Sequence, residues 1–274
     1  MGFSEPTFYA IGYAFLFVAT ILYIIHLIWG DEGLARLGRM ASIASLLALT
    51  AGLSVRTIAI RLWPLASTYD FALGFVWGLI LFHLVLERRM GMKAMGAFIL
   101  PIAFLIATYA LVLTPAEERV MGAPTPMLRS YIVPIHVTTA IVAYSSFAAS
   151  CSAGLMYLIR EAGFASRLPS LEEIDEFNSQ AIAFGFPWMT GLIITGMICA
   201  EDNWGAYWHW DPKEIWALIT WLVYVLFFHA RVIRGWKGRP MALLSIVGFM
   251  VVMSTFLGVR RLVRWMGLES LHLY

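Results

Sequence analysis

Long apolar stretches, separated by short polar segments, dominate this chain of 274 residues. A helix needs roughly 20 residues to cross the apolar core of a bilayer, which is about 30 Å thick. The pattern therefore predicts an all-α, polytopic membrane protein with about eight transmembrane helices. The stretches are Thr7–Trp29, Met40–Ile58, Tyr69–Leu86, Ala94–Leu113, Tyr131–Ile159, Ala181–Ala200, Ile215–Ile233 and Met241–Gly258.

The segments between these stretches are too short to form a soluble domain, so residues 1–274 are expected to form a single integral membrane domain. The fifth stretch is longer than a bilayer requires and is expected to extend beyond the membrane on one side. The first stretch is too long for the core of a signal peptide and lacks a basic leader and a small-residue cleavage site. We therefore expect it to be retained as a membrane helix.

Composition agrees with a membrane protein, because 61% of the residues are hydrophobic and 13% are charged, whereas soluble domains are nearer to one half and one quarter. The net charge of +2 is small and dispersed, and no basic segment with interleaved aromatics lies outside the stretches. We therefore exclude nucleic acid as a partner. Cys151 and Cys199 lie inside apolar stretches without a C-x-x-C partner, which indicates small buried side chains and not a thiol-exchange or metal site.

The distribution of lysine and arginine predicts an orientation. With eight helices, 11 of the 19 basic residues fall on one side of the membrane and 8 on the other. The richer side is normally cytoplasmic. We therefore expect both termini and the segment Glu201–Glu214 to lie outside.

The segment Glu201–Glu214 carries the candidate chemistry. Its sequence, EDNWGAYWHWDPKE, places four large aromatic residues within seven positions. An interfacial aromatic belt is one interpretation, because Trp and Tyr favour the headgroup level, but a belt distributes its residues over many helix ends. An aromatic surface with polar neighbours also suits a large, planar, apolar ligand.

The end of this segment has a structural interpretation as well. Asp211 at the N-cap, Pro212 at the first helical position and Glu214 two residues later form a capping box that would open the seventh helix. A rigid helix start is compatible with ligand binding, because it would fix the aromatic residues that precede it.

The run WGAYWHWDPKEIWALITWLVY, from Trp204 to Tyr224, resembles the tryptophan-rich WWD signature of heme-handling proteins in cytochrome c biogenesis. Its W-D-P-K-E ending is similar to the CcsA (ResC) branch of system II and not to the CcmC branch, which has W-D-x-R-L-T, and chain length disfavours the longer CcmF branch. Residues Pro64–Asp70 are similar to the family's P-x-S-N-x-Y-E. The resemblance covers most of the chain after residue 60.

The resemblance implies a heme-handling subunit of a holocytochrome c synthase in a bacterial cytoplasmic or thylakoid-type membrane. Such a subunit would bind heme b outside, after its transport from the cytoplasm, and present it to the C-x-x-C-H motif of apocytochrome c, beside a CcsB/ResB-type membrane partner. The chain shows no nucleophile or general-base pair, so catalysis would rest on orientation and proximity, and its status as an enzyme stays open. The alternatives are a heme exporter without a role in attachment and a membrane di-heme or quinone-linked electron carrier.

The resemblance also assigns the external heme ligands. It implies that His136, near the outer end of the fifth stretch, and His272, in the interfacial segment 259–274, are axial ligands of the heme iron. The match at His136 includes Val137, Tyr144 and Phe147, whereas the family's G-L-H-S-Y appears here as Ser270–Tyr274. The residues expected to contact the heme are Trp204, Tyr207, Trp208, Trp210 and Asp211.

The remaining histidines have less specific interpretations. His229 resembles the family's transmembrane histidine, an inner ligand for heme on its way from the cytoplasm, and the second inner ligand belongs to a partner protein. His26 or His83 could pair with His229, although each alone is more often structural. His209 either orients the ligand or has no special role. The C-terminal segment also contains a cluster of arginines, Arg260, Arg261 and Arg264. Either anionic lipid headgroups or the propionates of heme could bind it.

Overall fold

The computed structural model describes residues 4–60, 63, 67–119, 128, 130–164, 167–259, 263, 265 and 267, with only the backbone of Glu118. Several residues discussed above lie outside this part of the chain: Pro64, Leu65, Ala66, Arg260, Arg261, Arg264 and His272. The chain forms two compact units. Unit 1 comprises Met1–Arg129 and Ile159–Pro169, and unit 2 comprises Ser130–Leu158 and Ser170–Tyr274.

The prediction of an all-α polytopic fold is confirmed. Eight helical segments are long and apolar enough to cross a membrane, and the described residues contain no strand. Three spans are composite, because their last turn is π-helical. Whether the two units act as a single membrane domain stays a prediction.

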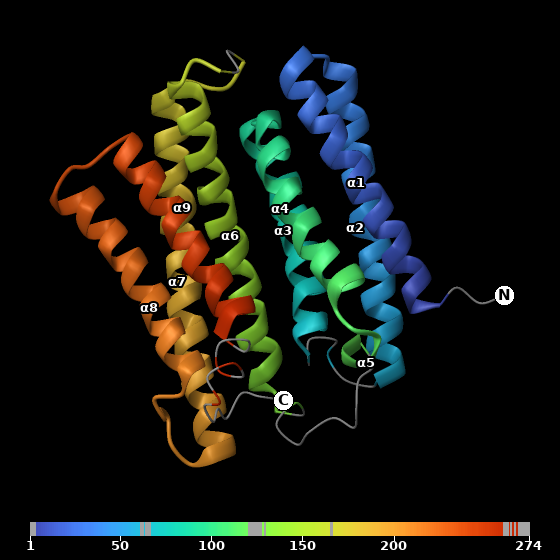
Figure 1. Cartoon of the computed structure of the whole chain (residues 1–274), viewed down its shortest axis with the longest axis vertical. Coiled ribbons are helices and arrows are strands. Elements are labelled where there is room, and N and C mark those ends of the chain that lie inside the picture. The colour runs from blue at the N-terminus through green and yellow to red at the C-terminus, as the bar shows by residue number, and fades with distance from the viewer. Residues whose placement is uncertain are drawn as a thin grey trace. The chain divides into compact units, whose positions relative to one another are not determined.

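Unit 1 contains the first four spans (Figure 1). Helix α1 packs against α2 and α4, and α3 packs against α2 and α4. The elements are α1 (Glu5–Trp29), α2 (Glu32–Ile60), α3 (Thr68–Met90), the 3-10 turn η1 (Lys93–Met95), α4 (Gly96–Thr108), the π-helical turn η2 (Tyr109–Leu113) and α5 (Ala116–Arg119).

Unit 2 contains the last four spans, although the final turn of α6, from Ile159, belongs to unit 1. Helix α8 packs against α7 and α9. The elements are α6 (Ile132–Glu161), α7 (Leu171–Trp204), α8 (Pro212–Phe228), the π-helical turn η4 (His229–Ile233), α9 (Arg239–Met253) and the π-helical turn η5 (Ser254–Gly258).

Two helices begin eight or more residues before their apolar stretches. Helix α7 begins at Leu171, ten residues before the expected Ala181, and α2 begins at Glu32, eight residues before Met40. The first turn of α7 is polar but capped, because Ser170 and Glu173 form a reciprocal capping box. Hydropathy does not detect such polar turns, whereas a capping box stabilises them.

Small residues let the helices of unit 2 approach closely. A Cβ atom on Gly154 of α6 would lie 2.6 Å from the carbonyl oxygen of Ala242 in α9. Ser146 of α6 donates a hydrogen bond to the carbonyl of Ala181 in α7 (2.6 Å). Small residues and interhelical hydrogen bonds are what hold helices together in a bilayer, where lipid is as apolar as the helix surface.

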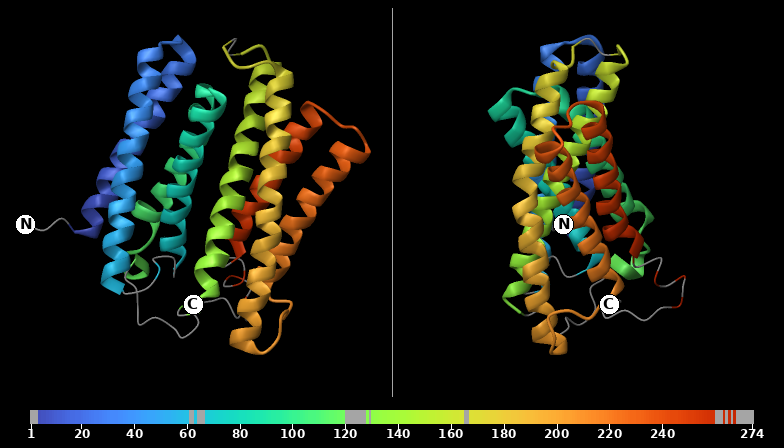
Figure 2. Two further views of the ribbon diagram at one scale, coloured as in Figure 1. Left: turned by 180° about the vertical axis from the view of Figure 1, so that it is seen from behind. Right: turned by 90° about the vertical axis from the view of Figure 1, so that its left-hand side faces the viewer.

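The four spanning helices of unit 2 alternate in direction. The start of α6, the end of α7, the start of α8 and the end of α9 therefore lie at one end of the unit, as two views show (Figures 1 and 2). We call it the aromatic end, because the segment Glu201–Glu214 lies there. This topology brings residues from distant parts of the sequence to the same end.

Candidate functional site

The aromatic segment lies between two well-defined helix ends. Helix α7 ends at Trp204, and Gly205 follows in the left-handed conformation with φ of 75°. Helix α8 begins at Pro212, after Asp211, whose buried carboxylate accepts a hydrogen bond from the Lys213 amide (2.9 Å). The predicted capping box is confirmed, because the Glu214 side chain accepts from the Asp211 amide (3.2 Å).

Glu214 reaches beyond the helix start. The carboxylate oxygen Oε2 that accepts from the Asp211 amide also accepts from the His209 amide (2.8 Å). The other oxygen, Oε1, lies 3.8 Å from Nδ1 of His209. One side chain at the start of α8 therefore holds the backbone of the aromatic segment.

The aromatic rings form two perpendicular pairs. Trp208 and Trp210 meet edge to face, with ring centroids 5.8 Å apart and planes at 87°. Trp204 and His209 meet in the same way, at 5.9 Å and 81°. A flat ligand could therefore lie on the face of one ring and contact the edge of its neighbour, which is a favourable arrangement for aromatic groups.

Two features of the segment are unfavourable without a ligand. Trp210 has φ of 56°, and a bulky residue in this conformation is strained by roughly 1–3 kcal/mol. The Nε1 atom of Trp208 is buried and has no hydrogen-bond partner among the described residues. At the same time Trp210 and Tyr207 are 68% and 56% exposed. Strain and an unsatisfied donor make the segment a candidate binding surface.

His136 is held in a defined orientation on α6. Its Nδ1 lies 3.1 Å from the carbonyl oxygen of Leu192 and 3.2 Å from Oγ1 of Thr195, both on α7. A carbonyl oxygen can only accept, so Nδ1 carries the proton that it donates. In the neutral imidazole the lone pair is then on Nε2, the ring nitrogen through which this tautomer would bind a metal.

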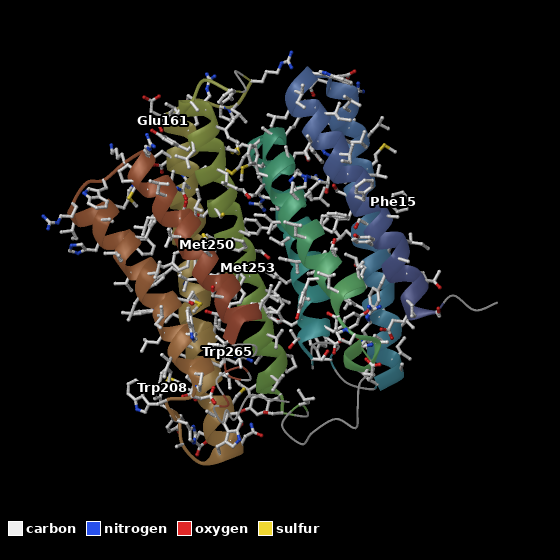
Figure 3. All side chains as sticks on the ribbon, viewed as in Figure 1. Phe15, Glu161, Trp208, Met250, Met253 and Trp265 are labelled. Carbon is white, nitrogen blue, oxygen red and sulfur yellow. The ribbon has the colours of Figure 1, made fainter. Side chains whose placement is uncertain are left out.

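His136 and the aromatic segment lie in the same part of unit 2. The His136 ring packs against Gly196 of α7, which is eight residues before Trp204, or about 12 Å along a helix. Figure 3 shows Trp208 at the aromatic end and Trp265, from the segment after α9, toward the same end. Trp265 precedes His272 by seven residues and is 83% exposed. The position of His272 stays a prediction.

His229 is not brought together with His136. It begins the π-helical turn η4 at the end of α8 opposite to Pro212, which is about 25 Å along the helix, and it is exposed. Arg231 of the same turn pairs with Asp175 of α7 (2.5 Å), which also accepts from the Gly238 amide (2.9 Å). This ion pair could not be predicted from the sequence, because its partners are 56 residues apart.

The structure places His83 in the core of unit 1. It is fully buried, meets the Tyr23 ring edge to face at 4.9 Å and lies 3.5 Å from Glu87. Glu87 also accepts hydrogen bonds from Arg39 (2.8 Å) and from the Tyr23 hydroxyl. These contacts favour a structural role for His83. The acidic residue one helical turn after His83 was the available signal in the sequence.

His26 and the two cysteines have local structural surroundings. His26 in α1 has its Nδ1 2.9 Å from the carbonyl oxygen of Asp31, a contact that joins the ends of α1 and α2. Cys151 and Cys199 are buried, free thiols. No group of three or more metal-ligating side chains occurs within the described ranges.

Comparisons with known proteins identify the family. The family model described as Cytochrome C assembly protein matches residues 65–266. The "Cytochrome c biogenesis protein CcsA" of Pyropia yezoensis is 31% identical over 299 residues, with 93% of each chain covered. The CcsA proteins of Synechococcus elongatus and Gloeobacter violaceus are each 30% identical, covering 87% and 94% of this chain and 88% and 93% of their own.

A solved structure shares the fold. The "Cytochrome c Heme Lyase CcmF" superposes with a TM-score of 0.70 at 15% identity, and the match covers 94% of this chain but 47% of that one. This chain thus spans about half the length of CcmF, and at this identity the likeness concerns the fold alone. The family model and the curated relatives both extend over most of the sequence, and the chain therefore belongs to the cytochrome c assembly protein family, among its CcsA-type members.

Proposed function

We propose that this chain is the heme-handling subunit of a holocytochrome c synthase. In this proposal the aromatic end of unit 2 holds heme b as a substrate and presents it for attachment to the C-x-x-C-H motif of apocytochrome c. The curated relatives are named for cytochrome c biogenesis, and the residues at the aromatic end fit a heme. The observation that carries the proposal is the orientation of His136.

His136 suits an axial ligand because its hydrogen bonds fix the required tautomer. Histidines that bind metals almost always donate their second ring N–H to a carbonyl or a carboxylate, which orients the ring and increases its basicity. The contact from Nδ1 to the Leu192 carbonyl supplies this arrangement. We propose His272 as the second axial ligand, on the resemblance alone.

The aromatic residues would provide the apolar contacts. The rings of Trp204, Trp208 and Trp210 offer faces and edges at a helix end, and Asp211 and Glu214 hold the backbone that carries them. The buried Nε1–H of Trp208 lacks an acceptor among the described residues. A propionate oxygen of heme would satisfy that donor, because a carboxylate accepts strongly from an N–H group.

The proposed role in attachment is one of orientation. Thioether formation adds the S–H of each reduced cysteine across a heme vinyl double bond, so the sulfur bonds to carbon, the proton goes to the second vinyl carbon, and no electrons are exchanged. No side chain of this chain is assigned a covalent step. Holding two reactants in the correct geometry can lower a barrier by about 7–11 kcal/mol.

The proposal includes a location and partners. The excess of basic residues on the opposite side indicates that the aromatic end and both termini face outward. The membrane is a bacterial cytoplasmic or thylakoid-type membrane, and a CcsB/ResB-type protein is the proposed membrane partner. His229, exposed at the opposite end, is the proposed inner ligand that receives heme from the cytoplasm.

The test is purification of the full chain with its native heme. We expect His136→Ala to lose bound heme and to stop cytochrome c maturation. His136→Cys replaces the imidazole by a thiolate and is expected to shift the heme absorption bands. Thr138→Ala, which removes only a local bond to the Pro134 carbonyl in the same helix, is the control. Unchanged spectra and maturation in both His136 variants would remove the proposed site.

A further inference from the structure

The conformation of Trp210 is unusual within the protein. Among the described residues it is the only one with positive φ that is not glycine. Its ring is 68% exposed, so burial of the indole against the protein does little to offset the strain. Strained backbone of this kind persists only where neighbouring interactions enforce it, and it is concentrated at functional sites.

Glu214 supplies the enforcing interactions. Its Oε2 atom accepts hydrogen bonds from the amides of His209 and Asp211, the residues on either side of Trp210. One oxygen atom can accept two such bonds. Because both flanking amides converge on the same atom, the chain must turn sharply between them, and Trp210 is at that turn.

A capping box does not require the hydrogen bond that Glu214 accepts from the His209 amide. In the capping box of α7, Glu173 contacts only the N-cap residue, through the amide and the hydroxyl of Ser170. Glu214 caps α8 in the same way and, in addition, binds an amide five residues before it. The second bond adds nothing to the helix start, since His209 lies outside the helix.

We propose that Glu214 is a positioning residue: its carboxylate holds Trp210 in the left-handed conformation and thereby presents the indole ring, at right angles to Trp208, to the bound heme. This inference rests on the proposed function and adds to it a residue that touches no substrate. Glu214 acts on the heme only through the backbone of Trp210.

The first experiment measures the backbone directly, by hydrogen exchange of the full chain in detergent, resolved to single residues. Glu214→Ala is expected to increase exchange at the His209 and Asp211 amides by about tenfold or more, as the loss of hydrogen bonds to a charged acceptor implies. Glu214→Gln keeps an oxygen that can accept both bonds and is expected to preserve most of the protection. Equal protection in wild type and Glu214→Ala would overturn the inference.

The second experiment measures heme content and absorption spectra of the same variants after purification. Glu214→Ala is expected to retain several-fold less heme than wild type, Glu214→Gln is expected to restore it, and Glu173→Ala is expected to have no effect. A Glu214→Gln protein that lost as much heme as Glu214→Ala would overturn the inference. The hydrogen bonds to the side-chain oxygen of residue 214 would then not be the cause of heme retention.

Trp210→Gly separates positioning from stability. Glycine adopts positive φ without strain, so this variant is expected to unfold at the same or a higher temperature and yet to retain less heme. A variant that lost stability would show that Trp210 serves packing and would overturn the inference. His136→Ala tests the proposed function independently: if His136→Ala releases heme while Glu214→Ala retains it fully, the proposed function stands and the positioning role falls.

Discussion

The core of unit 1 buries paired charges, whereas the aromatic end of unit 2 exposes aromatic side chains. In unit 1, Arg56 and Asp70 are 5% and 0% exposed and form an ion pair at 2.5 Å, and Arg56 also pairs with Glu5 at 2.7 Å. At the aromatic end, Trp210 is exposed and strained and Trp208 has a buried donor without a partner among the described residues.

Two of the histidines on spanning helices, His83 and His136, also differ. His83 is enclosed by Tyr23 and Glu87 and has no exposed surface. His136 is partly exposed, and α7 holds its Nδ1 while the other ring nitrogen keeps its lone pair. The comparison teaches that the two histidines differ in access: His83 is closed off in the core of unit 1, whereas α7 orients His136 and part of its surface stays exposed.

The largest expected effect concerns the ion pair of unit 1. Arg56→Met leaves the Asp70 carboxylate buried without its partner, and breaking a buried pair typically costs about 3–5 kcal/mol. The double variant Arg56→Met/Asp70→Leu removes both charges of this pair and is expected to recover part of that loss, since Glu5 still lacks Arg56 and α3 loses the capping contact from Asp70. The measurement is unfolding in detergent, monitored by circular dichroism. A double variant no more stable than Arg56→Met would show that the two residues are not coupled. The buried charges of unit 1 would then not stabilise each other, contrary to the comparison.

The second effect is on heme retention at the aromatic end. An indole that covers about 100 Å² of apolar ligand surface contributes roughly 2.5 kcal/mol, so Trp208→Ala and Trp210→Ala are expected to weaken heme retention by more than tenfold with little change in thermal stability. Heme content, cytochrome maturation and the unfolding temperature would be measured together. Loss of stability with full maturation would make the segment an interfacial anchor and would reverse the contrast between the two regions.

A smaller effect is expected at the opposite end of unit 2. His229→Ala is predicted to reduce the heme found at the aromatic end several-fold while the protein stays folded and inserted, because the exposed His229 side chain forms no hydrogen bond or ion pair with the described residues. Val232→Ala, an exposed position in the same turn, is the control. The same heme content in both variants would return His229 to a structural or neutral role.

The smallest effect separates capping from ligand contact. Asp211→Asn is expected to be mild, because Asn caps helices almost as well as Asp, whereas Asp211→Ala is expected to cost about 1 kcal/mol of local stability. Thermal unfolding of the two variants provides the measurement. If Asp211→Asn were as destabilising as Asp211→Ala, the negative charge of Asp211 and not its capping hydrogen bond would be essential. Asp211 would then be a candidate functional residue of the aromatic end.

Features that depend on local sequence were predictable. The eight spans follow from the length of the apolar stretches, which crossing a bilayer fixes. The start of α8 follows from Asp211, Pro212 and Glu214, because capping is decided by residues within one turn. The polar first turns of α2 and α7 were missed, since no hydrophobic signal marks them.

Features that depend on distant contacts were not predictable. The hydropathy pattern presents His83 and His136 alike, as histidines in apolar stretches, and only the family resemblance singles out His136. Tertiary structure distinguishes them, because Tyr23, which encloses His83 together with Glu87 of its own helix, comes from α1, and the carbonyl that orients His136 comes from α7, 56 residues away. The same holds for Trp210: residue types predict that a glycine would occupy a left-handed position, and only the convergence of two amides on Glu214 keeps a tryptophan there.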